Sequence, residues 1–396
     1  MLSVRVLDSI EALPATAWNA LELRGRPFLR HEFLAAAERS RSAAPESGWI
    51  PAHVAVYRDD RLAGAAPVYA KSHSWGEFVF DFAWARAYEQ HGLAYYPKLV
   101  AAAPFTPATG PRLLVHPDED GDAIRGALLA ALQSLRRDSG ASSLHALFVD
   151  DTDRTWLERQ GFLARLDCQF HWRNQGFACF DDFLATFTAE KRKKARRERR
   201  RVAEAGIHFQ ELHGADLDPR LLEIVYALHA RTFAERGNPP YFTLDFFRDI
   251  ARTMPEALMV KLALHQNEPV ACAVFLRGED TLYGRYWGAT GDFHSLHFET
   301  CYYQGIDYCI REGLARFEPG TQGEHKIARG FSPSPVWSMH DIAHPAFREA
   351  IGDYLRRERA HVSAYIDAIH AHVPFRRAEP QANLDVDVGR NLDKRV

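Results

Sequence analysis

The sequence predicts an α/β protein of two similar domains, each a mixed central sheet flanked by helices. Residues 53–71 and 259–277 both alternate apolar and polar side chains around a short polar turn, which is typical of a β-hairpin. A long helical pattern and then a short apolar run follow each hairpin, at residues 122–137 and 144–149 in the first half and at 296–312 and 314–318 in the second. The repeated order of elements indicates a duplicated fold.

The first half ends with a short helix and a strand. Residues 155–162 have a helical pattern that stops at a glycine, and the apolar run 163–171 follows it. We place the domain boundary after this strand, which gives an N-terminal domain of residues 1–170 and a C-terminal domain of residues 171–375. Residues 376–396 are polar and without periodicity, so we expect a mobile tail.

The helix at 296–312 leads into a segment with an unusual number of titratable groups. Phe298, Tyr302 and Ile306 recur at helical spacing and predict a buried face. After strand 314–318, proline and glycine residues force a turn that carries Gln322, Glu324, His325, Lys326 and Arg329. Such a cluster after a strand predicts a functional site, and a solvated loop is the alternative. We expect Lys326 to be exposed, so that its replacement by Ala removes activity but little stability.

Composition fits a large enzyme with sizeable cores. The chain has 396 residues, 46% of them apolar and 12% aromatic, which excludes general disorder. The net charge of −3 gives no global affinity for nucleic acid or an anionic membrane. Five cysteines without a CxxC pair indicate reduced thiols. The N-terminus has no leader pattern and no window is apolar enough for a membrane helix, so we expect a cytoplasmic protein.

Several longer blocks carry a resemblance to a known family: HSWGEFVFDFAWARAYEQHG, YYPKLVAAAPFTPATGPRLL, HWRNQGFACFDDFL, TLYGRYWGAT and the segment 296–331. Over nearly the whole chain they resemble the FemAB-like predicted N-acyltransferases, which are linked to peptidoglycan biosynthesis and related to Fem aminoacyltransferases and GNAT acetyltransferases. The resemblance implies tandem GNAT-like domains of the Fem type. It also implies transfer of an acyl or aminoacyl group from acyl-CoA (such as acetyl-CoA) or aminoacyl-tRNA to an amine, with a cell-wall precursor as one acceptor.

The sequence departs from the pattern of the loop that binds an acetyl-CoA donor. GNAT enzymes that use acetyl-CoA bind its phosphates with a loop of the form Arg/Gln-x-x-Gly-x-Gly/Ala. The nearest match here is Arg285-Tyr-Trp-Gly-Ala-Thr290, with threonine at the last position. This departure puts use of CoA in doubt and favours an aminoacyl-tRNA donor.

Amide formation requires a deprotonated amine, a polarised carbonyl and a proton for the leaving group. Histidine titrates near neutral pH and buried carboxylates can be tuned toward it, so we expect the catalytic residues among His297, Glu299, Glu324, His325 and Lys326. Alternating residues of one strand and basic or polar residues of the family blocks predict substrate contacts, namely Tyr283, Arg285, Trp287, Arg329, Tyr96, Lys98 and Asn174. We expect the second domain to form most of the cleft and the first to cap it.

Residues 191–201, KRKKARRERRR, predict a strongly basic helix over about 188–204. Lys191, Lys194 and Arg197 are candidate contacts to tRNA phosphates or to an anionic acceptor. A solvated helix is the alternative, because runs of charge usually face water. No aromatic residue interrupts the run, which argues against sequence-specific recognition.

Two other classes of function remain open at this stage. His294, His297, His325, His340 and His344 have spacings that would permit a metal site, but nothing fixes a ligand set, so we expect no metal. A non-catalytic protein that keeps the fold and binds a peptidoglycan precursor or a partner protein is the second alternative. The sequence does not indicate the oligomeric state.

Overall fold

The computed structural model describes residues 1–321, 323–371 and 373–376; the tail expected at 376–396 lies outside them except for Arg376. The strands of the first half are β1 (Leu2–Leu7), β2 (Trp49–Pro51), β3 (His53–Arg58), β4 (Arg61–Ala66), β5 (Val68–Lys71), β6 (Lys98–Ala101), β7 (Leu114–Val115), β8 (Ser143–Val149) and β9 (Leu163–Arg173). Those of the second half are β10 (Ile207–His213), β11 (Leu258–His265), β12 (Glu268–Arg277), β13 (Thr281–Ala289), β14 (Arg316–Glu318) and β15 (Ser332–Ile342).

The helices before β10 are α1 (Ala15–Asn19), α2 (His31–Arg39), α3 (Phe82–Gln90), α4 (Gly121–Asp138), α5 (Asp151–Arg159), α6 (Phe180–Ala185) and α7 (Ala189–Glu204). Those after it are α8 (Pro219–Ala234), α9 (Leu244–Thr253), α10 (Leu296–Phe298), α11 (Gln304–Arg311) and α12 (Pro345–His370). A π-helical turn, η5 (Glu299–Tyr303), joins α10 to α11, and a 3-10 turn, η6 (Glu324–Arg329), precedes β15. No helix in this described part of the chain is both long and apolar enough to cross a lipid bilayer.

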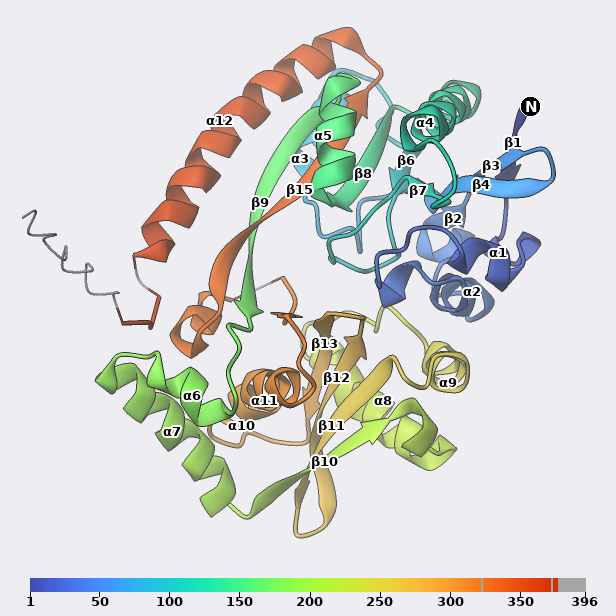
Figure 1. Cartoon of the computed structure of the whole chain (residues 1–396). Helices are drawn as coiled ribbons and strands as arrows, with labels where there is room; N and C mark the ends of the chain where they lie inside the picture. Colours follow the sequence, from blue (N-terminus) through green and yellow to red (C-terminus); the bar gives the residue numbers. More distant parts are fainter. Residues whose placement is uncertain (322, 372, 377–396) are drawn as a thin grey trace, which may run out of the picture.

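Within the described residues the strands form two sheets (Figure 1). The smaller has the order β1-β3-β4-β7, and the larger runs through both halves in the order β10-β11-β12-β13-β14-β9-β15-β8-β6-β5-β2. Parallel pairs occur at β13–β14 and β6–β8, while the remaining named strand pairs are antiparallel. The mixed α/β architecture predicted from the sequence is confirmed.

The second hairpin forms as predicted and the first only in part. β11 and β12 are joined by Gln266 and Asn267, both with positive φ, which is the backbone of a tight hairpin turn that matches strand twist. β3 and β4 also pair as a hairpin. The prediction that this hairpin extends to residue 71 is wrong, because Pro67 separates β4 from β5 and β5 joins the large sheet.

Helices cover the sheet of the second half on opposite sides (Figure 1). α8 packs on β12 and β13, and α11 packs on β13 and β14. Gly288 on β13 allows the close approach of α8, since a Cβ there would lie 1.9 Å from the carbonyl oxygen of Leu228. The expected helix at 296–312 is present, with the π-helical turn as a feature that its periodicity did not reveal.

The C-terminal segment belongs to the sheet of the first half. β15 lies between β9 and β8 and pairs with both, and α12 packs against β9 and β15. Residues 332–370, which the sequence analysis assigned to the C-terminal domain, therefore complete the sheet of the N-terminal half. The pairing of β14 with β9 makes the large sheet continuous across the two halves.

Candidate active site

The candidate site lies where two parallel strands diverge. β13 and β14 pair from Thr281↔Arg316 to Tyr283↔Glu318 and then separate. On β13 the register against β12 shifts at this point, so that Arg285 is an extra residue of a β-bulge, a feature often found beside active sites. Gly284 lets the chain after β14 come close, because a Cβ there would lie 3.2 Å from Cα of Pro319.

A cavity of about 370 Å³ opens at this divergence. The first half contributes Phe78 and Pro107 to its wall. The second half contributes Thr232, Phe233, Arg236, Asn238, Tyr241, Arg285, Tyr286, Trp287, His297, Tyr302, Pro319, Gly320, Thr321, His325 and Lys326. This distribution agrees with a cleft formed mainly by the second domain and capped by the first.

Lys326 reaches the cavity from η6 and is only 2% exposed. Its Nζ donates a hydrogen bond of 2.6 Å to the carbonyl oxygen of Gly320. Burial lowers the pKa of Lys326 to about 7, because the ammonium form loses its hydration. The expectation that Lys326 lies in an exposed loop is wrong, because η6 packs against β9, β15 and η5.

Two histidines and a tyrosine surround this lysine. Tyr302 and Nε2 of His325 share a hydrogen bond of 2.8 Å, and the rings of His297 and His325 are 5.9 Å apart. Burial and then the neighbouring basic groups, His325 first, lower the pKa of His297 to about 4. Burial, followed by Lys326 and Arg329, also lowers the pKa of His325. Both imidazoles are therefore neutral at pH 7 and able to accept a proton or a hydrogen bond.

Arg329, predicted to bind substrate, instead lies behind the cavity wall. Its guanidinium forms a buried ion pair of 2.8 Å with Glu198 of α7 and donates to the carbonyl oxygen of His325 at 2.6 Å. Tyr303 donates to the other oxygen of Glu198 at 2.6 Å. This arrangement fixes η6 against the basic helix.

Neither candidate carboxylate lines the cavity. Glu299 accepts hydrogen bonds from Gln304 at 2.8 Å and Arg199 at 3.2 Å, and burial raises its pKa. Glu324 accepts from the hydroxyl of Tyr365 at 2.7 Å on the outer side of η6. The structure thus places both away from the groups that they were expected to join.

The bulge also changes which strand residues face the cavity. Arg285 and Trp287 line it, as expected, and Trp287 lies 5.1 Å from His297 between ring centroids. Tyr283 points instead into the core against Phe28, at 4.9 Å between rings. Tyr286 lines the cavity in its place, because the extra residue breaks the alternation on which the prediction was based.

Three contacts predicted from the family blocks, Tyr96, Lys98 and Asn174, lie outside the cavity. Lys98 is fully buried and donates to Glu77 at 2.7 Å and to Asp81, and these carboxylates outweigh burial and raise its pKa. Tyr96 shares a hydrogen bond of 2.8 Å with Ser74. Asn174 accepts from the backbone N–H of Gly176 at 3.0 Å and so shapes a turn outside the cavity.

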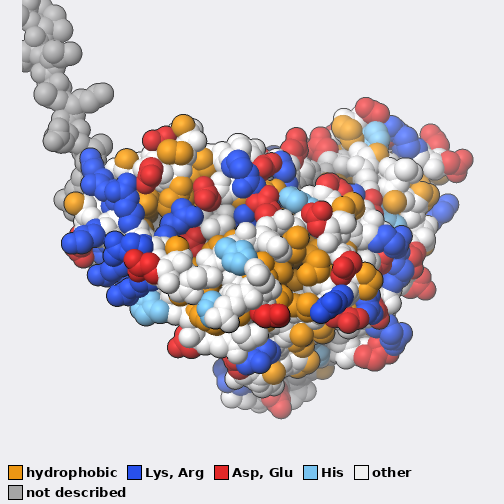
Figure 2. Space-filling view, turned by 90° about the horizontal axis from the view of Figure 1, so that it is seen from below, with side chains coloured by type: hydrophobic (Ala, Val, Ile, Leu, Met, Phe, Trp, Pro, Cys, Tyr) orange, Lys and Arg blue, Asp and Glu red, His pale blue; other side chains and the backbone are white. Residues whose placement is uncertain are grey.

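The predicted basic helix is α7 (Ala189–Glu204), preceded by α6. Figure 2 shows Lys and Arg side chains gathered at the left edge of the molecule, where α7 lies. Ala195, Glu198 and Val202 face the protein, whereas Lys194 and Arg197 are exposed and Lys191 is half-buried. The helix is therefore anchored along one face and cationic on the other.

Comparison with known proteins identifies the family. A model of the FemAB-like family, described as peptidoglycan biosynthesis/recognition, matches residues 9–377. The chain belongs to the FemAB-like family. No curated protein matched the sequence. The resemblance carried by the sequence blocks is confirmed.

Solved structures support the same fold. FemX superposes with a TM-score of 0.51 at 13% identity, covering 80% of this chain and 93% of that chain. A conserved protein of unknown function from Bacteroides thetaiotaomicron has a TM-score of 0.51 at 12% identity, covering 86% and 100%. A tandem GNAT protein from the clavulanic acid biosynthesis pathway gives 0.46 at 13% identity, covering 87% and 99%. The superpositions at a TM-score of 0.51 show that this FemAB-like protein shares the fold of FemX.

Sequence reasoning missed several residues that line the cavity. Tyr302 was assigned to the buried helix face, and Phe78 and Tyr286 were not considered. Arg236 and Tyr241 lie in the segment RGNPPY after α8, where glycine and proline after a helix indicate a loop of the kind that often carries function.

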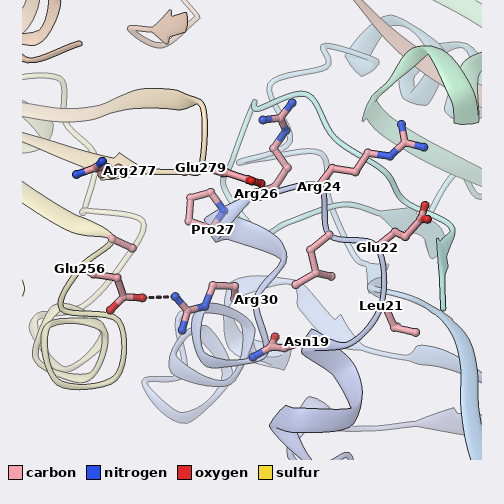
Figure 3. Close-up of a pocket in the computed structure, with 14 residues that line it drawn as sticks. Asn19, Leu21, Glu22, Arg24, Arg26, Pro27, Arg30, Glu256, Arg277 and Glu279 are labelled. Carbon is pink, nitrogen blue, oxygen red and sulfur yellow. Dashed lines mark hydrogen bonds and ion pairs between the residues drawn. The ribbon is translucent and has the colours of Figure 1, made fainter. Parts of the chain in front are cut away.

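A larger groove, of about 770 Å³, lies between the halves (Figure 3). Its arginines all have carboxylate partners: Arg24 with Asp150 at 2.7 Å, Arg26 with Asp280 at 3.0 Å, Arg30 with Glu256, and Arg277 with Glu312 at 3.2 Å. These pairs connect neighbouring segments and leave little unmatched positive charge for a ligand.

Among the described residues 1–321, 323–371 and 373–376, no group of His, Cys, Asp or Glu side chains is arranged to hold a metal ion. His340, one of the histidines considered for such a site, is buried in the first half and lies 2.6 Å from His145 between Nδ1 atoms.

Proposed function

We propose that this FemAB-like protein transfers an acyl or aminoacyl group from a thioester or a tRNA ester to an amine, with a peptidoglycan precursor as the acceptor. The proposal rests on the cavity at the divergence of β13 and β14, whose wall contains Lys326, His297 and His325. Family membership supports the link to peptidoglycan. A cytoplasmic location remains a prediction, which cell fractionation would test.

In this reaction the amine nitrogen attacks the carbonyl carbon, a C–N bond forms, and the bond to the sulfur or oxygen leaving group breaks. The amine loses one proton and the leaving group gains one. Lys326 is suited to carry that proton, because its pKa of about 7 makes both forms accessible near neutral pH. The hydrogen bond between Tyr302 and His325 orients this imidazole beside Lys326.

The basic face of α7 offers a contact for the donor. Lys191, Lys194 and Arg197 would bind the phosphates of a tRNA donor, whereas a CoA thioester needs no such extended surface. Arg199 of the same helix bonds Glu299 in η5, which continues into Tyr302, so this face lies on the same supporting elements as the cavity.

The test is transfer and binding with each donor class. Purified protein should be incubated with an amine-bearing peptidoglycan precursor and acetyl-CoA, longer acyl-CoAs or charged tRNA, alongside Lys326→Met. Product formation with a single donor class, lost in Lys326→Met, supports the proposal and names the donor. Precursor binding that is saturable and insensitive to Lys326→Met, without turnover by any donor, would favour the non-catalytic alternative.

A further inference from the structure

The cavity is lined by cations that have no acidic counterpart. Arg236, Arg285 and Lys326 line it together with two histidines, and no Asp or Glu is among the described lining residues. The larger groove between the halves is the opposite case, because each of its arginines has a carboxylate partner. The larger groove thus does not share the excess of unpaired cations found in the candidate site.

The partners of these cations are neutral. Arg285 donates to the carbonyl oxygen of Phe105, and its guanidinium lies 5.4 Å from the ring of Phe28 and 5.6 Å from that of Tyr286. Lys326 bonds only a backbone carbonyl among the described residues. Arg236 is exposed at the cavity mouth, and no carboxylate of the described chain contacts it. Carbonyls and rings leave the positive charge of Arg236 and Arg285, and that of Lys326 when it is protonated, available to a ligand.

The positive charges that line the cavity would act on the charge state of an amine ligand. The cations that lower the pKa of His297, after burial, include Lys326 and Arg236, and a bound ammonium group would meet the same repulsion. An amine without a compensating charge would thus be repelled at neutral pH. A molecule that also carries an anion would be attracted through the anion, while its amine would be pushed toward the neutral, nucleophilic form.

We propose that the acceptor carries an oxyanion, either a carboxylate or a phosphate, on the same molecule as its reactive amine, and that Arg236 and Arg285 hold this oxyanion. The inference rests on the proposed function, because it assigns the amine to the acceptor. Guanidinium groups suit both anions, since their planar donors can bind two oxygens at once. Phe233, Tyr241 and Trp287 supply apolar walls for the body of the ligand.

Binding of matched probe pairs to the full chain tests the proposal. The carboxylate pair is 6-aminohexanoate and 6-aminohexanamide, and the phosphate pair is phosphoethanolamine and ethanolamine. We expect the anionic member of at least one pair to bind about tenfold or more tightly than its neutral partner in ligand-observed NMR titrations. Arg236→Ala and Arg285→Ala should each remove most of that preference, and Arg285→Lys should keep part of it.

Arg231→Ala is the matched control, because Arg231 lies on α8 and donates to the carbonyl oxygen of Thr290 at 3.2 Å without lining the cavity. Equal binding of anionic and neutral members in both pairs would overturn the proposal, as would a preference that Arg231→Ala removes as effectively. Arginine variants that weaken only acyl-CoA would assign the oxyanion to the donor and overturn it as well. Anion-dependent binding without transfer from any donor would contradict the proposed function but not the anion site.

Discussion

Lys326 lies in an environment unlike that of an ordinary surface lysine. It is 2% exposed, its hydrogen-bond acceptor is a carbonyl oxygen, and its pKa is lowered to about 7. If it accepts the proton of the attacking amine, only its neutral form is active. We therefore expect kcat to rise with pH through about 7 and then level off. A flat profile between pH 6 and 9, or retained turnover in Lys326→Met, would remove it from the reaction.

The lowered pKa of Lys326 also predicts how the stability of the protein depends on pH. Between about pH 7 and 10.5 the unfolded chain binds a proton at Lys326 that the folded chain has released, so the wild-type protein gains stability as pH rises across this window. Below pH 7 the folded state holds a buried charge, which Lys326→Met removes. Thermal melts should show the variant more stable than wild type at pH 6, with the difference shrinking toward pH 10. A constant difference would contradict the lowered pKa.

The sequence indicated some residues of the site correctly and could not indicate others. His297, His325, Lys326, Arg285 and Trp287 line the cavity as expected. Local spacing does not reveal that a bulge turns Tyr283 inward, nor that Glu299 bonds a helix about a hundred residues earlier, because both depend on contacts between distant segments.

At the scale of elements, α7 is joined to η6 by the buried pair of Glu198 and Arg329, which are 6% and 4% exposed. Removing one partner leaves an unpaired buried charge, so Glu198→Ala should cost about 3 to 5 kcal/mol of unfolding free energy. Glu204 on the same helix forms a solvent-exposed ion pair with Arg200. Glu204→Ala should therefore cost less than about 1 kcal/mol of unfolding free energy. Urea denaturation of both variants measures the difference, and equal costs would contradict a structural tie.

The outer face of α7 has unmatched positive charge. Lys193, Lys194 and Arg197 are exposed, and within the described chain no carboxylate pairs with them. Lys193 and Arg197 are also neighbours at i, i+4, where like charges destabilise a helix. A binding role for phosphates would explain why this repulsion is present.

Reversing these three charges to Glu should weaken tRNA binding about tenfold or more and flatten its dependence on salt, as measured by fluorescence anisotropy. Reversal of Arg159, Arg220 and Arg357, which are also exposed, changes net charge equally at other surfaces and is the control. Equal losses in the two triple variants would indicate only a general charge effect, and no loss in either would leave α7 a solvated helix.

At the scale of the whole molecule, the sequence predicted the duplicated order of elements but not the return of the chain to its first half. β15 contains Pro333 and Pro335, residues that argue against a central strand. In the structure both lie in the part of β15 that pairs only with β9, and pairing with β8 begins at Trp337. Both prolines are tolerated there, because that part of β15 has a partner strand on one side only.

This return predicts that the first half does not fold alone. Residues 1–175 lack β15, so β8 and β9 would have unpaired edges in the middle of a sheet, and the apolar side chains beneath α12 would meet water. We expect this fragment to aggregate or to lack a cooperative thermal transition. Joining residues 1–175 to 330–370 through a flexible linker should restore a cooperative monomer, because β15 and α12 then reach their places on β8 and β9. Cooperative melting of residues 1–175 by themselves, seen by circular dichroism and gel filtration, would show that the two halves are independent despite the continuous sheet.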